Sequence, residues 1–296
     1  MKAKLIGAVV VVFLAGWLAG TARANFELYG VEQKTVDTAH LLGVLHNQSQ
    51  ADVVTGGSVT DGIWAYDTST VNISGGTVNQ VYAYDSSTVD MSAYWVNHLD
   101  AFDTSTVDIS GGSVGDVMTY DSSTVNISGG SVQEDVYVVN TSTATISGGS
   151  VDEVWTAHTG TVHITGGQVR IAGVNGGVVN VSGGSIGGLT AYGSVLVNVS
   201  GGSIGSMYGL KAYDSALVTF NAPVFHLGPG LSLDGERVLG TGILGGVWFD
   251  GTPWAVPISQ NAAGATILAI PEPATLSLLA VGGLAMLRRR RRSHPV

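Results

Sequence analysis

The sequence contains no cysteine and few prolines, and both shortages narrow the fold. Without cysteine, the 296-residue chain has no disulfide, no thiolate metal site and no cysteine nucleophile. Only 7 prolines stand against 43 glycines, a balance that favours a turn-rich all-β chain over a helical one. The stability of such a chain has to come from hydrogen-bond ladders and apolar packing.

Basic residues are also scarce, and most of the 12 lysines and arginines lie near the two ends. Between residues 25 and 270 the chain carries 21 acidic and 4 basic residues, a formal balance of −17. A surface of that charge repels phosphate backbones, because nucleic-acid binding depends on lysine and arginine contacts. The sequence therefore argues against nucleic acid as a partner.

Residues 1–24 have the three parts of a secretory signal peptide. Two lysines precede an apolar run over residues 5–19, and Ala22 and Ala24 flank Arg23 as a small-x-small cleavage site. We expect the general secretion machinery to export the chain and signal peptidase to cut after Ala24. The alternative is an uncleaved membrane anchor, although the apolar run is short for a membrane span.

The C-terminal segment, residues 269–296, has an equally distinct composition. A Pro-Glu-Pro triplet precedes an apolar stretch over residues 276–287, which we expect to form a short membrane helix, and an arginine cluster follows it. The arginines favour a cytoplasmic location for that end. The residues of this expected signal are Pro271, Glu272, Pro273, Arg288, Arg289, Arg290, Arg291 and Arg292.

This order of elements resembles a PEP-CTERM sorting tail. The resemblance implies a Gram-negative bacterium and an exosortase-type membrane enzyme as a processing partner. It also implies that Pro271, Glu272 and Pro273 are recognition residues, and that the protein is held transiently in the inner membrane before it reaches the cell surface or the medium. A plain tail anchor is the alternative interpretation.

The middle of the chain is one short unit repeated many times. Adjacent copies are 17 to 19 residues apart when aligned on a Gly-Gly pair, and Ala93-Tyr94-Trp95-Val96 fills the one gap as a degenerate copy. Such a sustained short period predicts a solenoid with one coil per unit. The Gly-Gly pairs begin at Gly56, Gly75, Gly111, Gly129, Gly148, Gly166, Gly183 and Gly201.

Apolar and polar residues alternate inside each unit, as at Val71 and Ile73 or Val125 and Ile127. Strict alternation predicts strands with one buried face, and the Gly-Gly pair predicts a corner. The expected fold is therefore an all-β parallel β-helix, or solenoid, of about ten 18-residue coils. Its expected segments are an N-terminal cap over 25–46, repeats over 47–227 and a C-terminal cap over 228–268.

In a stacked solenoid, a residue type that repeats in every unit becomes a column on the surface. Neighbouring Thr, Asn/Asp and Ser columns predict a polar lattice, and we interpret it either as a binding face for ice or polysaccharide or as ladder residues that bond to their own copies. Asp90, Asp108 and His163 interrupt the middle column, which favours the ladder interpretation. The candidate ligand face comprises Thr70, Thr88, Thr106, Thr124, Asn72 and Asn126.

Two further columns lie at a turn of the unit. The carboxylates Asp67, Asp85, Asp103 and Asp121 favour Asx-type turns, with bridging by Ca²⁺ as the alternative. An aromatic residue precedes each of them, and this column is interpreted as a ladder that braces the turn or as a surface that stacks on sugars.

The sequence offers one candidate for catalysis, the carboxylates Asp116, Glu134 and Glu153 between the Gly-Gly corner and the next strand. Paired carboxylates are what a glycosidase needs, but an acidic position that repeats gives such pairs automatically. We therefore expect a non-enzymatic surface or matrix protein without a cofactor, with a structural or adhesive role. A glycan-cleaving solenoid enzyme is the alternative.

Overall fold

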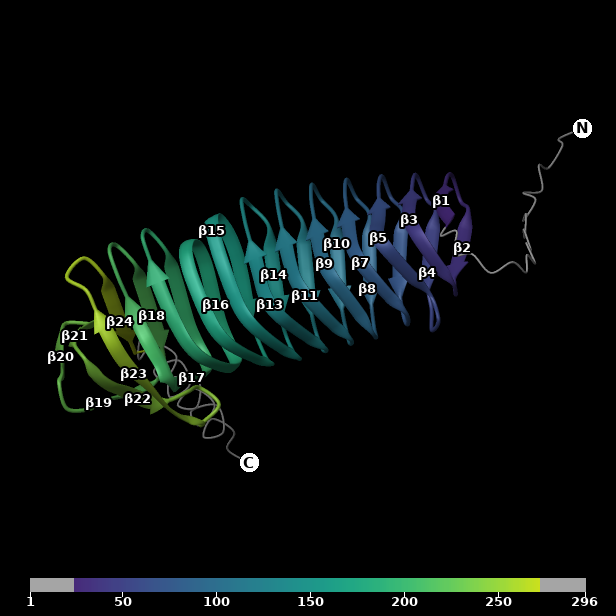
Figure 1. The fold of residues 1–296 in the computed structure, drawn as a ribbon. Coiled ribbons are helices and arrows are strands. Elements are labelled where there is room, and N and C mark those ends of the chain that lie inside the picture. Colours follow the sequence, from purple (N-terminus) through teal and green to yellow (C-terminus); the bar gives the residue numbers. More distant parts are fainter. Residues whose placement is uncertain (1–23, 272–296) are drawn as a thin grey trace, which may run out of the picture.

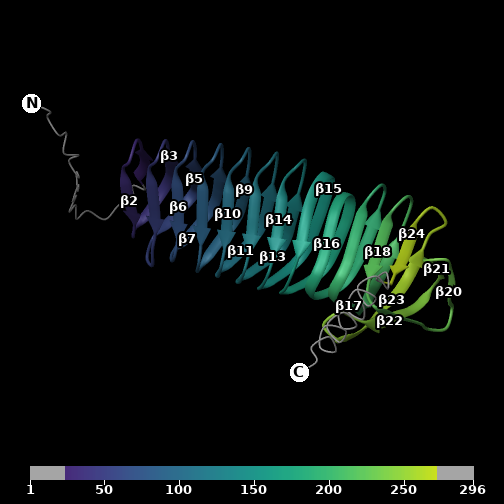
Figure 2. The same cartoon turned by 180° about the vertical axis from the view of Figure 1, so that it is seen from behind.

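The protein is a stack of repeated coils that together form a rod (Figure 1), and the computed structural model describes residues 24–271. About 11 coils follow one another along the rod. Figures 1 and 2 show β1 and β2 at one end and β19–β24 at the opposite end. The expected solenoid is confirmed, whereas the expected signal peptide and most of the C-terminal tail lie outside the described residues.

Each coil contributes one short and one long strand, and strands of the same kind pair in parallel from coil to coil. The short-strand layer consists of four- or five-residue strands, most of which have two buried positions. They are β2 (Gln33–Val36), β4 (Gln50–Val53), β6 (Thr70–Ile73), β8 (Thr88–Met91), β10 (Thr106–Ile109), β12 (Thr124–Ile127), β14 (Thr143–Ile146), β18 (Leu217–Asn221) and β24 (Thr266–Ile270), joined by parts of β15 (Ser150–Ile164), β16 (Gln168–Tyr192) and β17 (Leu196–Ala212).

The long-strand layer forms the other half of each coil. In most of its strand pairs, the register shifts near the middle of the strand. It comprises β1 (Ala24–Leu28), β3 (Ala39–Leu45), β5 (Ser58–Ala65), β7 (Thr77–Ala83), β9 (Trp95–Ala101), β11 (Ser113–Thr119), β13 (Ser131–Val138) and β23 (Pro253–Asn261), with the remaining parts of β15, β16 and β17.

The core is a set of apolar columns between the two layers. Val71 and Ile73 on β6, and Val125 and Ile127 on β12, are fully or almost fully buried. Because each column repeats in register from coil to coil, one small pattern of β-branched residues fills the whole rod.

The Gly-Gly corner explains why the repeat keeps its glycines. A Cβ at Gly111 would collide with the backbone carbonyl of Ser92 in the preceding coil, and Gly112 has φ of +79°. Tyr94 occupies the second corner position of the degenerate copy and still adopts φ of +68°. The corner therefore imposes left-handed backbone even where its glycine is missing.

The expected N-terminal cap over 25–46 has no fold of its own in the structure. Strands β1 and β2 pair in parallel with β3 and β4, so the stack already begins at Ala24. The end of the core is filled by Phe26, whose ring meets His40 edge-on at 5.3 Å between centroids and lies beneath Lys34.

The expected C-terminal cap over 228–268 is partly solenoid and partly cover. Strands β23 and β24 extend the stack, since they pair in parallel with β17 and β18. The chain between them and β18 forms β19 (Val224–Leu227), β20 (Leu231–Asp234), β21 (Arg237–Gly240) and β22 (Gly242–Val247), which pair only in antiparallel fashion. This antiparallel segment covers the edge of the last coil (Figure 2).

Candidate functional site

The predicted Thr/Asn/Ser lattice lies on the outer side of the short-strand layer, with its columns in register. Thr70 faces Thr88, Thr106 faces Thr124, and Asn72 faces Asp90. The Asn and Asp side chains bond along their own column: Asn126 Nδ2 donates to Asp108 Oδ1 over 2.8 Å, and the other two such bonds are Asn72 to Asp52 and Asn198 to Asn180. The Asn/Asp column of the lattice therefore uses hydrogen-bonding groups to hold coils together.

The Asp column at the turn has a similar internal role. Asp67, Asp85, Asp103 and Asp121 all have φ between 55° and 59°. The backbone N–H of Asp67 donates to Asp85 Oδ2 over 3.0 Å, and that of Asp85 donates to Asp103 Oδ2 over the same distance. Asp67, Asp85 and Asp103 thus accept hydrogen bonds from the preceding coil, and Asp121 accepts one from Asn140 in the following coil, an arrangement that differs from the expected Asx turns within one coil.

The structure gives no support for a metal at these carboxylates. Within residues 24–271, no three His, Cys, Asp or Glu side chains lie close enough together to hold a metal ion.

The aromatic column beside the Asp column is a continuous stack of rings. Tyr66, Tyr84, Phe102 and Tyr120 stack with 4.8 to 5.0 Å between successive centroids, and His46 and Tyr29 extend the column toward the N-terminus. Since neighbouring rings cover each other's faces, the inner rings present only their edges to solvent. This geometry favours the interpretation as a ladder over sugar stacking.

A second outward aromatic column was missed by the sequence analysis. Trp64, Tyr82, Tyr137 and Trp155 occupy the same position on successive long strands, with Asp100 and Met118 between the two pairs. Its sequence signal is an outward residue two places before the turn aromatic, as in Trp64-Ala65-Tyr66, but the residue type varies too much to show a repeat.

The three predicted carboxylates do not form one column. The column runs through His98, Asp116, Asp135 and Glu153, because Asp116 faces His98 and Glu153 faces Asp135. Glu134 is exposed and lies one place out of register. Strand β13 is one residue longer than β11, and its bulge between Val132 and Asp135 shifts the alignment that equal spacing had predicted.

Asp100, in the degenerate coil, has the most perturbed carboxyl group in this layer. Burial raises the pKa of Asp100 to about 6, and the charge of Asp116 adds to the shift while His98 opposes it. His98 Nδ1 pairs with Asp116 Oδ1. A carboxyl group that titrates near neutral pH beside an ion pair is a feature of binding sites and active sites, and also of structural networks.

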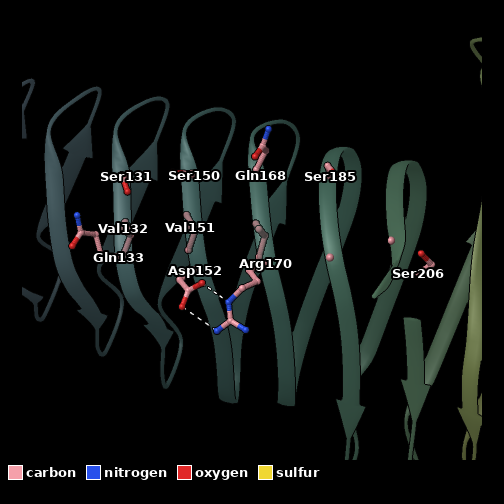
Figure 3. A pocket seen from close by; sticks show the side chains of 13 residues that line it. Ser131, Val132, Gln133, Ser150, Val151, Asp152, Gln168, Arg170, Ser185 and Ser206 are labelled. Atoms are coloured by element: carbon pink, nitrogen blue, oxygen red, sulfur yellow. Dashed lines mark hydrogen bonds and ion pairs between the residues drawn. The ribbon is translucent and has the colours of Figure 1, made fainter. Parts of the chain in front are cut away.

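An open groove of about 610 Å³ crosses four successive coils, where residues of β13, β15, β16 and β17 line it. Figure 3 shows its side chains. Its floor and walls are mostly serine, glutamine and glycine, with one ion pair. Arg170 Nη2 donates to Asp152 Oδ2 over 3.0 Å, and the same guanidinium contacts Glu153. The Arg170 hydrogen bond is the main cause that lowers the pKa of Asp152.

Trp155 stands beside this groove, on the same strand as Asp152 and Glu153. Its indole N–H donates to Glu153 Oε2 over 2.9 Å. Gly173 faces Trp155 in the next coil, and a Cβ at Gly173 would collide with the indole ring. The ring therefore lies over Gly173, against the sheet, in the space that a side chain would fill.

Comparison with known families identifies the C-terminal segment. Residues 269–292 match the family model described as the PEP-CTERM protein-sorting motif. No curated protein and no solved structure matches the chain. In the part of the chain that the structure describes, no helix has the length and apolar character to cross a membrane. The chain thus joins a β-solenoid body to a PEP-CTERM sorting motif, which implies an exported protein that the membrane enzyme exosortase processes.

Proposed function

We propose that this protein is a non-enzymatic, structural or adhesive component of the cell surface or of its polysaccharide matrix. The observation that carries the proposal is the sorting motif at the end of an acidic rod of coils that pair in register. The Asn/Asp column of the lattice, the Asp column and the inner aromatic ladder make contacts between coils. A long body that presents regular outer faces suits a structural or adhesive role.

Cleavage at both ends is part of the proposal. Signal peptidase removes residues 1–24, exosortase recognises Pro271, Glu272 and Pro273, and the mature chain leaves the inner membrane. Strand β24 ends at Ile270, so the motif begins inside the last strand of the rod and Pro271 is exposed next to it. The enzyme therefore acts directly beside the last coil.

Fractionation of the native cells with intact-mass measurement tests this proposal. We expect a species that starts near Asn25, ends near Pro271 and is found outside the inner membrane. Replacement of Glu272 by alanine should leave the longer species in the membrane, whereas replacement of Asp250, an exposed carboxylate outside the motif, should not. A wild-type chain that keeps Arg288 to Arg292 in the inner membrane would show a plain tail anchor and would overturn the surface role.

The alternative as a glycan-cleaving enzyme has one observation in its favour, the partly buried Asp100 with its raised pKa close to the carboxylate of Asp116. Carboxyl groups with separated pKa values are the usual acid and base of glycoside hydrolysis. Incubation with a panel of neutral and acidic polysaccharides tests it. Product release that disappears in both Asp100→Asn and Asp116→Asn, but persists in Glu134→Gln, would replace the non-enzymatic proposal.

A further inference from the structure

Trp155 differs from Trp64 and from the rings of the turn ladder in what its ring faces cover. Trp64 stacks on Tyr82 with 5.1 Å between centroids, and the inner rings of the turn ladder cover one another in the same way. Trp155 instead lies over Gly173, where no side chain competes for the ring. One face of the indole packs on the sheet, and the ring remains half-buried. It thus forms a flat apolar platform on the rod.

The charge around this platform is negative and incompletely paired. Asp135 lies opposite Glu153, one coil away, and Arg170 contacts Asp152 and Glu153. Burial raises the pKa of Asp135, and the charge of Glu153 raises it further, while hydrogen bonding to Trp155 opposes both. A cation placed beside Asp135 would relieve this repulsion.

The neighbouring groove adds polar groups within reach of the same ligand. Ser150, Gln133 and Gln168 line it together with Asp152 and Arg170 (Figure 3). Hydroxyl and amide side chains suit a ligand with many hydroxyl groups, a flat indole suits the apolar face of a sugar ring, and the carboxylates suit an ammonium group.

We propose that the surface formed by Trp155, Asp135 and the adjoining groove binds an amino-sugar oligosaccharide. One sugar ring lies on the indole, its ammonium group lies beside Asp135 and Glu153, and the next rings extend over the groove. The inference rests on the proposed adhesive role and names the class of glycan to which the rod adheres.

Isothermal titration of the full chain in mild detergent with a hexamer of β-1,4-linked glucosamine tests the proposal. We expect saturable binding, weakened about tenfold or more by Trp155→Ala and by Asp135→Asn. Trp155→Phe should retain part of the affinity. Trp64→Ala removes a tryptophan from the same column but from a stacked position, so it should bind like the wild type. Circular dichroism checks that each variant is folded. If Trp155→Ala does not fold, the isosteric Asp135→Asn alone tests the proposal.

Two competitors separate the contributions. The N-acetylated hexamer keeps the shape of the rings without their charge and should bind more weakly. Hexalysine keeps the charge without the rings, so it should not displace the sugar when both supply the same concentration of positive charge. Three results would overturn the proposal: no binding by the wild type, binding by Trp155→Ala and Asp135→Asn as tight as that of the wild type, or full displacement of the sugar by hexalysine. None of these results changes the mass or the location of the mature chain, so the proposed function and this inference fail separately.

Discussion

Replacement of Tyr94 by glycine should stabilise the rod, which is an uncommon expectation for a change that removes an aromatic side chain. Tyr94 has φ of +68°, close to the values of +69° and +79° at Gly76 and Gly112 in the same corner of the adjoining coils. Its side chain is 52% exposed, so its removal sacrifices little buried apolar area.

The magnitude follows from two opposing terms. Left-handed backbone costs a residue with a Cβ about 1–2 kcal/mol. Glycine loses more conformational freedom on folding, which costs about 0.5–1 kcal/mol. The net expectation is a gain of about 0.5–1 kcal/mol, provided that the exposed ring contributes little. Tyr94→Ala keeps the backbone cost and removes the ring, so it should be neutral or slightly destabilising.

Urea unfolding followed by tryptophan fluorescence and far-ultraviolet circular dichroism measures the difference. The two probes must report coincident transitions, because a stack of repeats does not always unfold in one step. A Tyr94→Gly variant that is as unstable as Tyr94→Ala would refute the reasoning, since the ring and not the backbone would then decide the energy of this corner.

Three further changes have defined outcomes. Ser123→Ala should cost about 1 kcal/mol in urea unfolding, because the Ser123 hydroxyl donates its one hydrogen to the carbonyls of Tyr120 or Ala101, both within hydrogen-bond distance, and accepts from the Tyr120 N–H. The equally buried Ser87 has no partner for its hydroxyl, so Ser87→Ala should be neutral, and equal losses in the two variants would contradict this. Burial raises the pKa of Asp100 to about 6 in the folded state, so this group favours folding below about pH 4 and loses that contribution as the pH rises through 6; Asp100→Asn should therefore raise the midpoint of urea unfolding at pH 8 but not at pH 4, and an equal change at both would refute the assignment. A four-residue Gly-Ser insertion after Ile270 should speed tail processing in a pulse-chase experiment by moving the motif away from β24, and unchanged processing would show that the last strand does not limit access.

The repeat made most of the fold predictable. Alternation at Val71 and Ile73 gave the strands and their buried side, and the Gly-Gly spacing gave the coil, because each unit meets the same neighbours. The first coil was not predicted as part of the stack, because the sequence around Phe26 and Val36, which fill its core, does not match the repeat. The antiparallel cover between β18 and β23 follows no period at all, and only tertiary pairing determines it.

The candidate site was harder to predict for a related reason. Equal spacing aligned Glu134 with Asp116 and Glu153, but one additional residue in β13 placed Asp135 there instead. A single-residue shift in a strand changes which side chains share a face, and the residue types alone do not predict where such a shift occurs. The position of Trp155 over Gly173 depends on a missing side chain in another coil, which no pattern within one unit reveals.

These departures from the repeat are also where side chains of the rod lack a matching partner in the neighbouring coil and can contact a ligand. A residue type that recurs in every coil finds its own copy above and below, and the Asn/Asp, Asp and aromatic columns show that such copies satisfy one another. Where the residue type changes within a column, the neighbouring coil no longer supplies a matching partner. Asp100 lies between Tyr82 and Met118, and Gly173 lies beside Trp155. The buried carboxyl group and the uncovered indole follow from that mismatch, because the backbone ladder continues in register whatever the side chain. In this solenoid, regularity therefore accounts for stability, and its interruptions are the places to look for recognition.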